Sequence, residues 1–274
     1  MSTGSCPSRS VDGVDDAQLD DVAAALKSAE RILWITGAGL SADSGLPTYR
    51  GVGGLYDTAT PEEGQPIETI LSGEMLAANP ALTWKYLLVV ARATAGSSFN
   101  RGHEIIAAFD DRVTTNCVLT QNVDGYHSAA GARDVIEIHG NLHHLSCTRC
   151  SWRGDAIDHA DPRREVDVPV RCPACGATAR PDVVLFGEAL PIAALERFEQ
   201  TMGSGLDLVL SVGTSSLFPY IAAPIMHARQ IGVMAVEINP TLTPVSDQVD
   251  VRLPGGAAAV LSALWARVTE GASS

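Results

Sequence analysis

Short apolar runs alternate with amphipathic segments along most of the chain. Several of these runs are typical of buried or half-buried strands: residues 31–36, 113–120, 134–138, 206–212 and 233–238. A helix is predicted after Asp16, with Leu19, Val22, Ala23 and Leu26 on one face, and residues 68–95 are mostly helical in pattern. Strands that alternate with helices predict an α/β fold, in which helices cover both faces of a parallel sheet.

Residues 147–175 break this pattern, because they hold charged residues and turn formers but little apolar periodicity. We therefore expect a small module, at about residues 143–180, to be inserted into the connectivity of the sheet. Residues 1–16 are expected to form a disordered tail, and residues 17–274 a folded domain that carries this module.

Four cysteines in the insertion form two CxxC pairs, Cys147 with Cys150 and Cys172 with Cys175. Two such pairs supply four thiolates, the tetrahedral set of a closed structural zinc site, whereas a redox role needs only one pair. We expect one structural Zn²⁺. Cys6 and Cys117 have no partner spacing, so we place Cys6 in the tail and Cys117 in the core.

The chain has 274 residues, a formal net charge of −13 and a pI of about 4.8. Such an acidic chain repels nucleic acid and attracts lysine-rich protein segments, although acidity also serves solubility. No stretch approaches the roughly 20 apolar residues of a membrane span, and the N-terminus lacks the features of a secretory signal. We expect a cytoplasmic monomer without membrane or nucleic-acid partners.

Polar or glycine-rich clusters follow several predicted strands. They are residues 37–41, 120–124 and 213–216, with Glu237 and Asn239 at the end of a further strand. Ligands bind at the carboxyl ends of parallel strands, so these clusters predict a nucleotide site, although tight turns and helix caps look similar. His139 also follows a strand, where it is either a general base or a satisfied structural histidine.

Taken in order, these pieces resemble the sirtuin family. The matching segments are Gly37-Ala38-Gly39-Leu40-Ser41, residues 45–50, residues 120–124, His139-Gly140, the four cysteines, residues 180–188, residues 212–215 and residues 238–240. The match extends over about residues 20–265, nearly the whole chain.

The resemblance implies a large Rossmann-like domain and a small zinc-binding domain, with NAD and an acylated lysine of a protein or peptide meeting between them. In the implied reaction the acyl oxygen attacks the ribose carbon that bears nicotinamide, nicotinamide leaves and an alkylimidate forms. His139 accepts a proton from the ribose hydroxyls so that the sugar can attack. The implied products are free lysine, nicotinamide and O-acyl-ADP-ribose.

The family pattern also implies residue roles. Catalysis is assigned to His139, with Asn122 and Asp124 shaping the nicotinamide pocket. The implied cofactor-binding residues are Gly37, Ala38, Gly39, Ser41, Tyr49, Arg50, Gln121, Asn122, Val123, Asp124, Gly213, Thr214, Ser215, Asn239 and Ala257. The implied substrate-binding residues are Leu87 and Val90 in the acyl channel, and Val184, Phe186, Gly187 and Glu188 along an added peptide strand.

The sequence departs from the family pattern in three respects. Tyr49 replaces a usual phenylalanine, and Pro219 comes one residue early after Gly-Thr-Ser. Leu87 and Val90 stand where the desuccinylase subgroup carries a Tyr-x-x-Arg pair, so we expect acetyl and longer apolar acyl groups to be preferred over succinyl. The alternatives are an ADP-ribosyltransferase or NAD hydrolase on the same fold, and a noncatalytic zinc-ribbon interaction protein.

Overall fold

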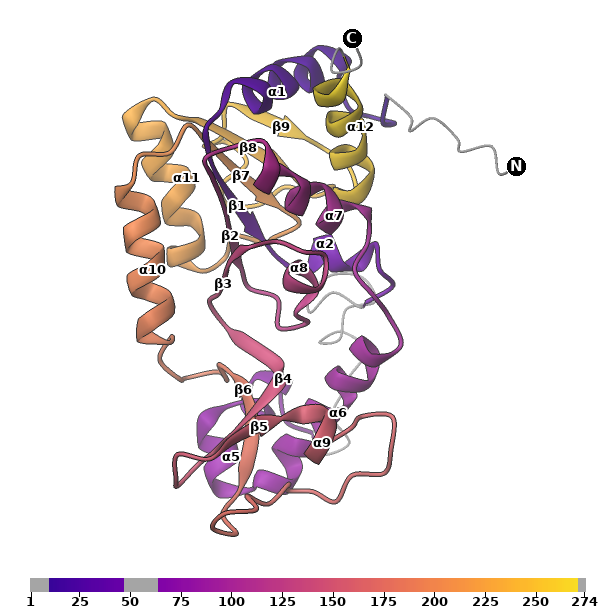
Figure 1. Cartoon of the computed structure of the whole chain (residues 1–274), viewed down its shortest axis with the longest axis vertical. Coiled ribbons are helices and arrows are strands. Elements are labelled where there is room, and N and C mark those ends of the chain that lie inside the picture. Colours follow the sequence, from indigo (N-terminus) through magenta and orange to yellow (C-terminus); the bar gives the residue numbers. More distant parts are fainter. Residues whose placement is uncertain (1–9, 47–63, 271–274) are drawn as a thin grey trace, which may run out of the picture.

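A six-stranded parallel sheet forms the centre of the larger part of the molecule (Figure 1). The computed structural model describes residues 10–46 and 64–270. In spatial order the strands are β3 (Asp134–Glu137), β2 (Thr115–Thr120), β1 (Arg31–Thr36), β7 (Leu208–Val212), β8 (Met234–Ile238) and β9 (Val251–Leu253). The chain order reverses between β1 and β7, which is the Rossmann arrangement. The predicted parallel sheet is confirmed.

Helices cover both faces of this sheet, which explains why its strands are apolar rather than alternating. Ile32 and Trp34 of β1 pack on one side, and Leu33 and Ile35 pack on the other. The first side is covered by α1 (Asp16–Ser28), α7 (Arg101–Ala108) and α12 (Ala257–Thr269), and the second by α10 (Ile192–Gly203) and α11 (Pro219–Ile231) (Figure 1).

A small module lies at one end of the molecule (Figure 1). Its antiparallel sheet has the order β5 (Arg153–Asp155), β4 (Gly140–Cys147) and β6 (Ala179–Val183). The helices α4 (Ile67–Ile70), α5 (Gly73–Ala78), α6 (Pro80–Ala95) and α9 (Ala156–His159) belong to it. The module is thus larger than the expected 143–180, because a second chain segment packs against the cysteine-bearing one.

Trp84 on α6 joins these two segments. Its side chain is 1% exposed, packs with Leu88, Leu145 and Ala179, and donates from Nε1 to the carbonyl oxygen of Ala179 at 2.8 Å. A buried indole N–H requires such an acceptor, so this contact fixes α6 against β6.

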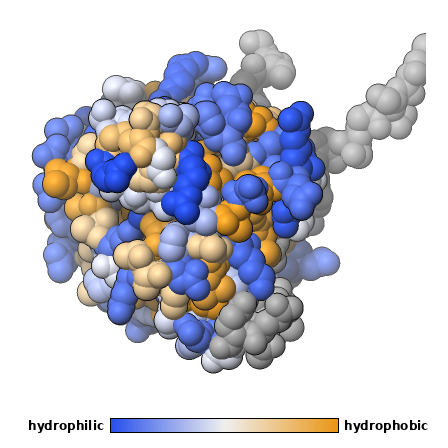
Figure 2. Space-filling model, turned by 90° about the horizontal axis from the view of Figure 1, so that it is seen from below, coloured by the Kyte–Doolittle hydropathy of each residue, from blue (hydrophilic) through white to orange (hydrophobic). Residues whose placement is uncertain are grey.

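The surface of the module is a mixture of polar and apolar residues, as Figure 2 shows from the module's end of the molecule. Two of its arginines are paired with acids, Arg153 with Asp182 at 2.5 Å and Arg163 with Asp161 at 2.9 Å. This pairing fits a solvated surface better than a basic docking patch.

Residues 10–16, expected in the disordered tail, are placed and partly packed. Val11 and Val14 lie against the core, and α1 already begins at Asp16. Arg267 on α12 holds this end of α1 through ion pairs to Asp16 at 2.6 Å and Asp20 at 2.8 Å.

Among the described residues, none of the helices combines the length and apolarity needed to cross a membrane.

Two buried histidines lie beneath the carboxyl ends of β1 and β2. His103 on α7 is 0% exposed and His127 on α8 (Tyr126–Ala129) is 2% exposed, with ring centroids 4.9 Å apart. His127 Nε2 hydrogen bonds with Thr36 Oγ1 at 2.9 Å, which donates to Thr120 Oγ1 at 2.9 Å. Burial lowers the pKa of His103 to about 4 and that of His127 well below its usual value, so both rings are neutral at pH 7.

This pair makes the fold sensitive to acid. The unfolded chain binds protons at both histidines below about pH 6.5 while the folded chain does not, so stability falls as pH decreases from there. For His103 alone the expected loss is about 2–3 kcal/mol between pH 7 and pH 4.5. His103→Gln keeps a capping-box side chain at this helix position and removes the titrating group.

Urea unfolding at pH 7 and pH 4.5 should therefore show a smaller difference in unfolding free energy for His103→Gln than for the unmodified chain. An equal difference in the two proteins would contradict the buried neutral state of His103.

Candidate nucleotide and zinc sites

The turn after β1 and the loop after β7 touch through their backbones. Gly39 N donates to Gly213 O at 2.7 Å, and a Cβ added at Gly39 would lie 2.7 Å from that oxygen. Gly213 has φ +60°, and a Cβ there would lie 2.4 Å from Leu40 N. The sequence predicted that these glycines let the backbone approach a pyrophosphate, but the contact between the two loops already requires glycine at both positions. The contact brings together the strand ends at the point where the strand order of the sheet reverses.

Ser41, Asn122 and Asp124 form one buried cluster at this edge. Ser41, on α2 (Ala38–Ala42), donates from Oγ to Asp124 Oδ2 at 2.7 Å, and Asn122 Nδ2 donates to Ser41 Oγ at 3.1 Å and to Gly37 O at 3.0 Å. Asp124 is 6% exposed, and its burial raises the pKa of the carboxyl, although hydrogen bonds from Tyr126 N and Ser41 oppose the shift. The side chains satisfy one another's hydrogen bonds and form a fixed, buried polar cluster.

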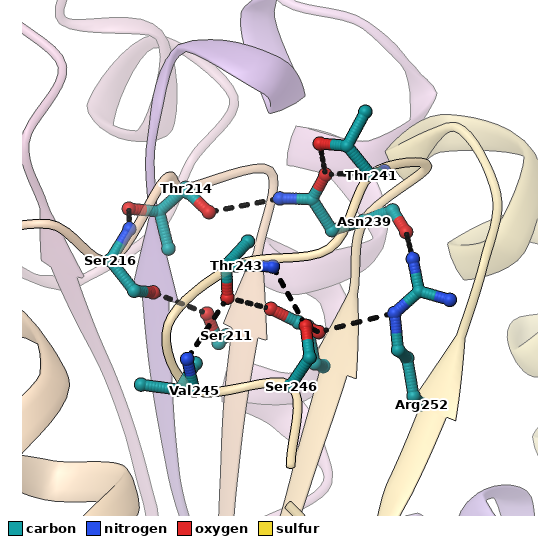
Figure 3. A network of polar contacts seen from close by, with 10 residues as sticks. Ser211, Thr214, Ser216, Asn239, Thr241, Thr243, Val245, Ser246 and Arg252 are labelled. Carbon is teal, nitrogen blue, oxygen red and sulfur yellow. Dashed lines mark hydrogen bonds and ion pairs between the residues drawn. The ribbon is translucent and has the colours of Figure 1, made fainter. Parts of the chain in front are cut away.

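A second cluster surrounds Thr214. Its Oγ1 accepts from Gln121 Nε2 at 2.6 Å. The same Oγ1 accepts from Ser216 N at 3.2 Å, and Asn239 Nδ2 donates to the Thr214 carbonyl at 2.9 Å (Figure 3). Ser215 is exposed, whereas Ser216 is 3% exposed and has φ 51°. The sequence did not predict that the Ser216 side chain is buried, because nothing in it indicates a left-handed backbone conformation at that position.

Asn239 is joined by Arg252 to a network around Glu237, which is 0% exposed. Arg252 Nη2 donates to the carbonyl oxygen of Asn239 at 3.1 Å (Figure 3). The Glu237 carboxylate accepts from Thr243 Oγ1 and from Ser246 Oγ, and pairs with Arg252 Nε at 3.4 Å. Because this buried charge is neutralised within the protein, Glu237 supports the loop that carries Asn239.

His139 stands where the large sheet passes into the small module. Its Nδ1 hydrogen bonds with Gln121 O at 3.1 Å, and its Nε2 hydrogen bonds with Tyr220 Oη at 2.7 Å. Burial lowers the pKa of His139 below its usual value, while the bond to Gln121 raises it less. The ring is therefore neutral at pH 7. Its hydrogen bond to Gln121 links it to the residue that directly precedes Asn122.

Residues 184–188, expected to receive a peptide, already use several of their polar groups. Val184 N donates to His139 O at 2.8 Å, and Phe186 N donates to Leu71 O at 2.9 Å. The Glu188 carboxylate binds Arg180 at 2.5 Å and accepts from Leu185 N at 2.8 Å, while Gly187 is exposed. Glu188 thus stabilises the turn of this segment through a partly buried ion pair.

Leu87 and Val90 share an apolar cluster with Val123, Leu142 and Phe186. Leu87 also lines a cavity of about 420 Å³ that lies along α6 and is bordered by Asp124 and Arg163. The guanidinium of Arg163 makes two bonds to Asp161, at 2.9 and 3.2 Å. The two side chains that the sequence placed in an acyl channel are therefore buried together in apolar surroundings.

The remaining predicted positions are distributed as follows. Ala38 opens α2, Val123 lies between Asn122 and Asp124, and Ala257 is the buried first residue of α12. Ala258 N next to it donates to Asp43 Oδ2 at 2.8 Å, which ties α12 to the end of α2. Tyr49 and Arg50 lie outside the described residues.

The four cysteines of the insertion converge, with all their sulfur atoms within 4.8 Å of one another. Cys147 Sγ lies 3.5 Å from Cys175 Sγ, and Cys150 Sγ lies 3.7 Å from Cys172 Sγ. Zn–S bonds of about 2.3 Å in a tetrahedron require S···S separations of about 3.8 Å. The residues fit one structural Zn²⁺, and Cys117 is buried elsewhere, in the core.

Loss of one sulfur should open this site. Cys172 is 2% exposed, so Cys172→Ser should release the metal and lower the melting temperature, because structural zinc binding is coupled to folding. Metal content by mass spectrometry of the native protein and a thermal melt would check this. Cys117→Ser, with a similarly buried thiol outside the cluster, should keep one zinc per chain; a metal-free Cys172→Ser protein with unchanged melting would contradict a structural role.

Comparison with known proteins identifies relatives over most of the chain. The model of the Sir2 family matches residues 37–218. NAD-dependent protein deacylase 2 of Pseudomonas aeruginosa is 49% identical over 238 residues, which cover 86% of this chain and 91% of that protein.

Solved structures agree with this assignment. A Sir2 homolog–NAD complex matches with a TM-score of 0.82 at 30% identity, covering 93% of this chain and 95% of its own. A Sir2–p53 peptide–NAD⁺ complex matches with a TM-score of 0.77 at 25% identity, covering 92% of this chain and 97% of its own. The resemblance seen in the sequence motifs is confirmed, and this chain belongs to the Sir2 family.

Proposed function

We propose that this chain removes acyl groups from protein lysines in a reaction that consumes NAD. The observation that carries the proposal is the placement of His139, a neutral imidazole bonded to Gln121 O beside the buried Asn122–Ser41–Asp124 cluster. A general base must be neutral before it accepts a proton and must lie at the reacting group, and His139 meets the first condition at pH 7. The family relationship and the relatives named as NAD-dependent deacylases support the same reaction.

The polar groups at the sheet edge suit NAD as the second substrate. NAD supplies an ADP-ribosyl group with nicotinamide as the leaving group. Asn122 and Asp124 are assigned to the nicotinamide pocket, and Gln121, Thr214 and Asn239 to the riboses. Thr214 Oγ1 already accepts two hydrogen bonds, so its own hydroxyl proton is the group that can donate to a ligand.

His139 is assigned the deprotonation of a ribose hydroxyl, through Nε2. The carbonyl of Gln121 accepts from Nδ1–H, which leaves the Nε2 lone pair as the proton acceptor. Retention of this base favours deacylation over ADP-ribosyl transfer to protein or simple NAD hydrolysis, because neither alternative needs the ribose hydroxyl as a nucleophile.

The protein substrate is assigned to the segment around Val184 and Gly187. Gly187 is exposed with φ +81°, and Val184 is tied to the backbone of His139. A peptide laid along this segment brings a modified lysine next to the base. The net charge of −13 attracts lysine-rich segments to it.

Replacement of the base tests the proposal. His139→Ala should reduce deacetylation of an acetyl-lysine peptide by about 10²–10⁴-fold, the usual effect of losing a general base. Nicotinamide exchange precedes the ribose deprotonation, so part of it should persist. His144→Ala, on an exposed ring of β4 that hydrogen bonds with Asp155 at 3.3 Å, serves as a comparison for nonspecific damage. Near-normal peptide turnover in His139→Ala would rule out the assigned role.

The acyl group is proposed to be apolar. Leu87 and Val90 are 4% and 7% exposed and lie one helical turn apart, in a cluster of apolar side chains. A succinyl carboxylate brought among them would lose its hydration without a partner, at a cost of several kcal/mol. The nearby cation, Arg163, is already bound to Asp161.

We therefore expect kcat/KM to be far higher on an acetyl-lysine peptide than on the succinyl-lysine version of the same peptide. Each added methylene that fits should contribute about 0.8 kcal/mol, so longer alkyl groups should remain substrates. Equal or better turnover of the succinyl peptide would refute the apolar channel. A succinyl activity that disappears in Arg163→Ala would identify that guanidinium as the carboxylate partner.

A further inference from the structure

Tyr220 contacts the imidazole of His139 at the atom that the proposed reaction requires. Its Oη lies 2.7 Å from His139 Nε2. Tyr220 is in the first turn of α11, directly after Pro219, and its ring stacks on Phe218 with centroids 5.4 Å apart and planes at 14°. Both aromatic rings meet the imidazole edge-on, at centroid distances of 5.8 and 6.1 Å.

The partners of His139 determine which tautomer it adopts. The carbonyl oxygen of Gln121 only accepts, so Nδ1 must carry the proton and Nε2 must carry the lone pair. The Tyr220 hydroxyl therefore donates to Nε2. Burial raises the pKa of Tyr220 to about 12, which keeps this hydroxyl protonated at neutral pH. The opposite tautomer would place a lone pair against the Gln121 carbonyl and is excluded.

The same lone pair must accept the ribose hydroxyl proton, and Nε2 has only one. We propose that Tyr220 is a positioning residue for His139: its hydroxyl holds the ring with Nε2 as the acceptor, and is exchanged for the ribose hydroxyl when the nucleotide binds. This inference rests on the proposed role of His139 as the base.

The early proline accounts for the placement of this tyrosine. Pro219 occupies the first turn of α11, where it needs no N–H partner, so the helix begins there and Tyr220 follows on the same turn. The stack on Phe218 then restrains the phenol ring. Since the ring does not depend on the hydroxyl for this stacking, Tyr220→Phe should leave the ring packing intact and remove only the bond to Nε2.

The exchange predicts a gain in nucleotide affinity when the hydroxyl is removed. ADP-ribose carries the same ribose, and it no longer has to displace a hydrogen bond in Tyr220→Phe. Because one such bond contributes about 0.5–1.5 kcal/mol net, calorimetric titration of the zinc-loaded full chain should give a Kd about 2- to 10-fold lower. Tyr126→Phe, which removes a hydroxyl bonded to Thr94 O, provides the matched control and should not tighten binding.

A double substitution shows whether Tyr220→Phe changes the Kd for ADP-ribose through His139 or through a general change in the site. In a His139→Ala background, Tyr220→Phe should no longer change the Kd, since the competing acceptor is gone. An unchanged or weaker affinity of Tyr220→Phe, or the same gain in the His139→Ala background, would overturn the inference. Failure of the proposed function is recognised separately, by His139→Ala retaining deacylation.

Discussion

Backbone contact between the turn after β1 and the loop after β7 determines the geometry of the whole site. Gly39 and Gly213 approach so closely that neither could carry a Cβ without displacing the other's backbone. This contact lies at the point where the strand order reverses, so it sets the separation between the halves of the sheet. Ser41 follows on one side and Thr214 on the other, and each organises its own polar cluster. Any side chain at either glycine would therefore disturb both clusters.

The second constraint is the joint between the large sheet and the small module. His139 comes directly before Gly140, whose φ is +77° and whose added Cβ would lie 2.0 Å from Asp182 O. The chain thus turns sharply against β6 just after the imidazole. Three residues then hold the backbone or ring of His139: Gln121 just after β2, Val184 just after β6, and Tyr220 on α11. Zinc held by the four cysteines would tie the end of β4 to the segment that leads into β6 in the same module.

The local and periodic features could be predicted from the sequence. The buried strands of the sheet and the zinc ligands follow from short-range patterns, apolar runs and CxxC spacing. Contacts between distant segments could not be predicted. The contact of Trp84 with Ala179 makes α6 part of the small module. The ion pair with Arg180 occupies the carboxylate of Glu188, which the sequence had assigned to peptide binding. The early Pro219 marked the loop after Ser215 as unusual, but only the three-dimensional path brings Tyr220 to His139.

The buried polar clusters, the proposed base His139 and the four-cysteine module fit a single chemistry, transfer of an acyl group from lysine to ADP-ribose. The most direct measurement is mass spectrometry of the products formed from NAD and an acetyl-lysine peptide. The account predicts free lysine peptide, nicotinamide and O-acetyl-ADP-ribose in equal amounts. ADP-ribose attached to the peptide, or free ADP-ribose with the acetyl group still on lysine, would contradict it.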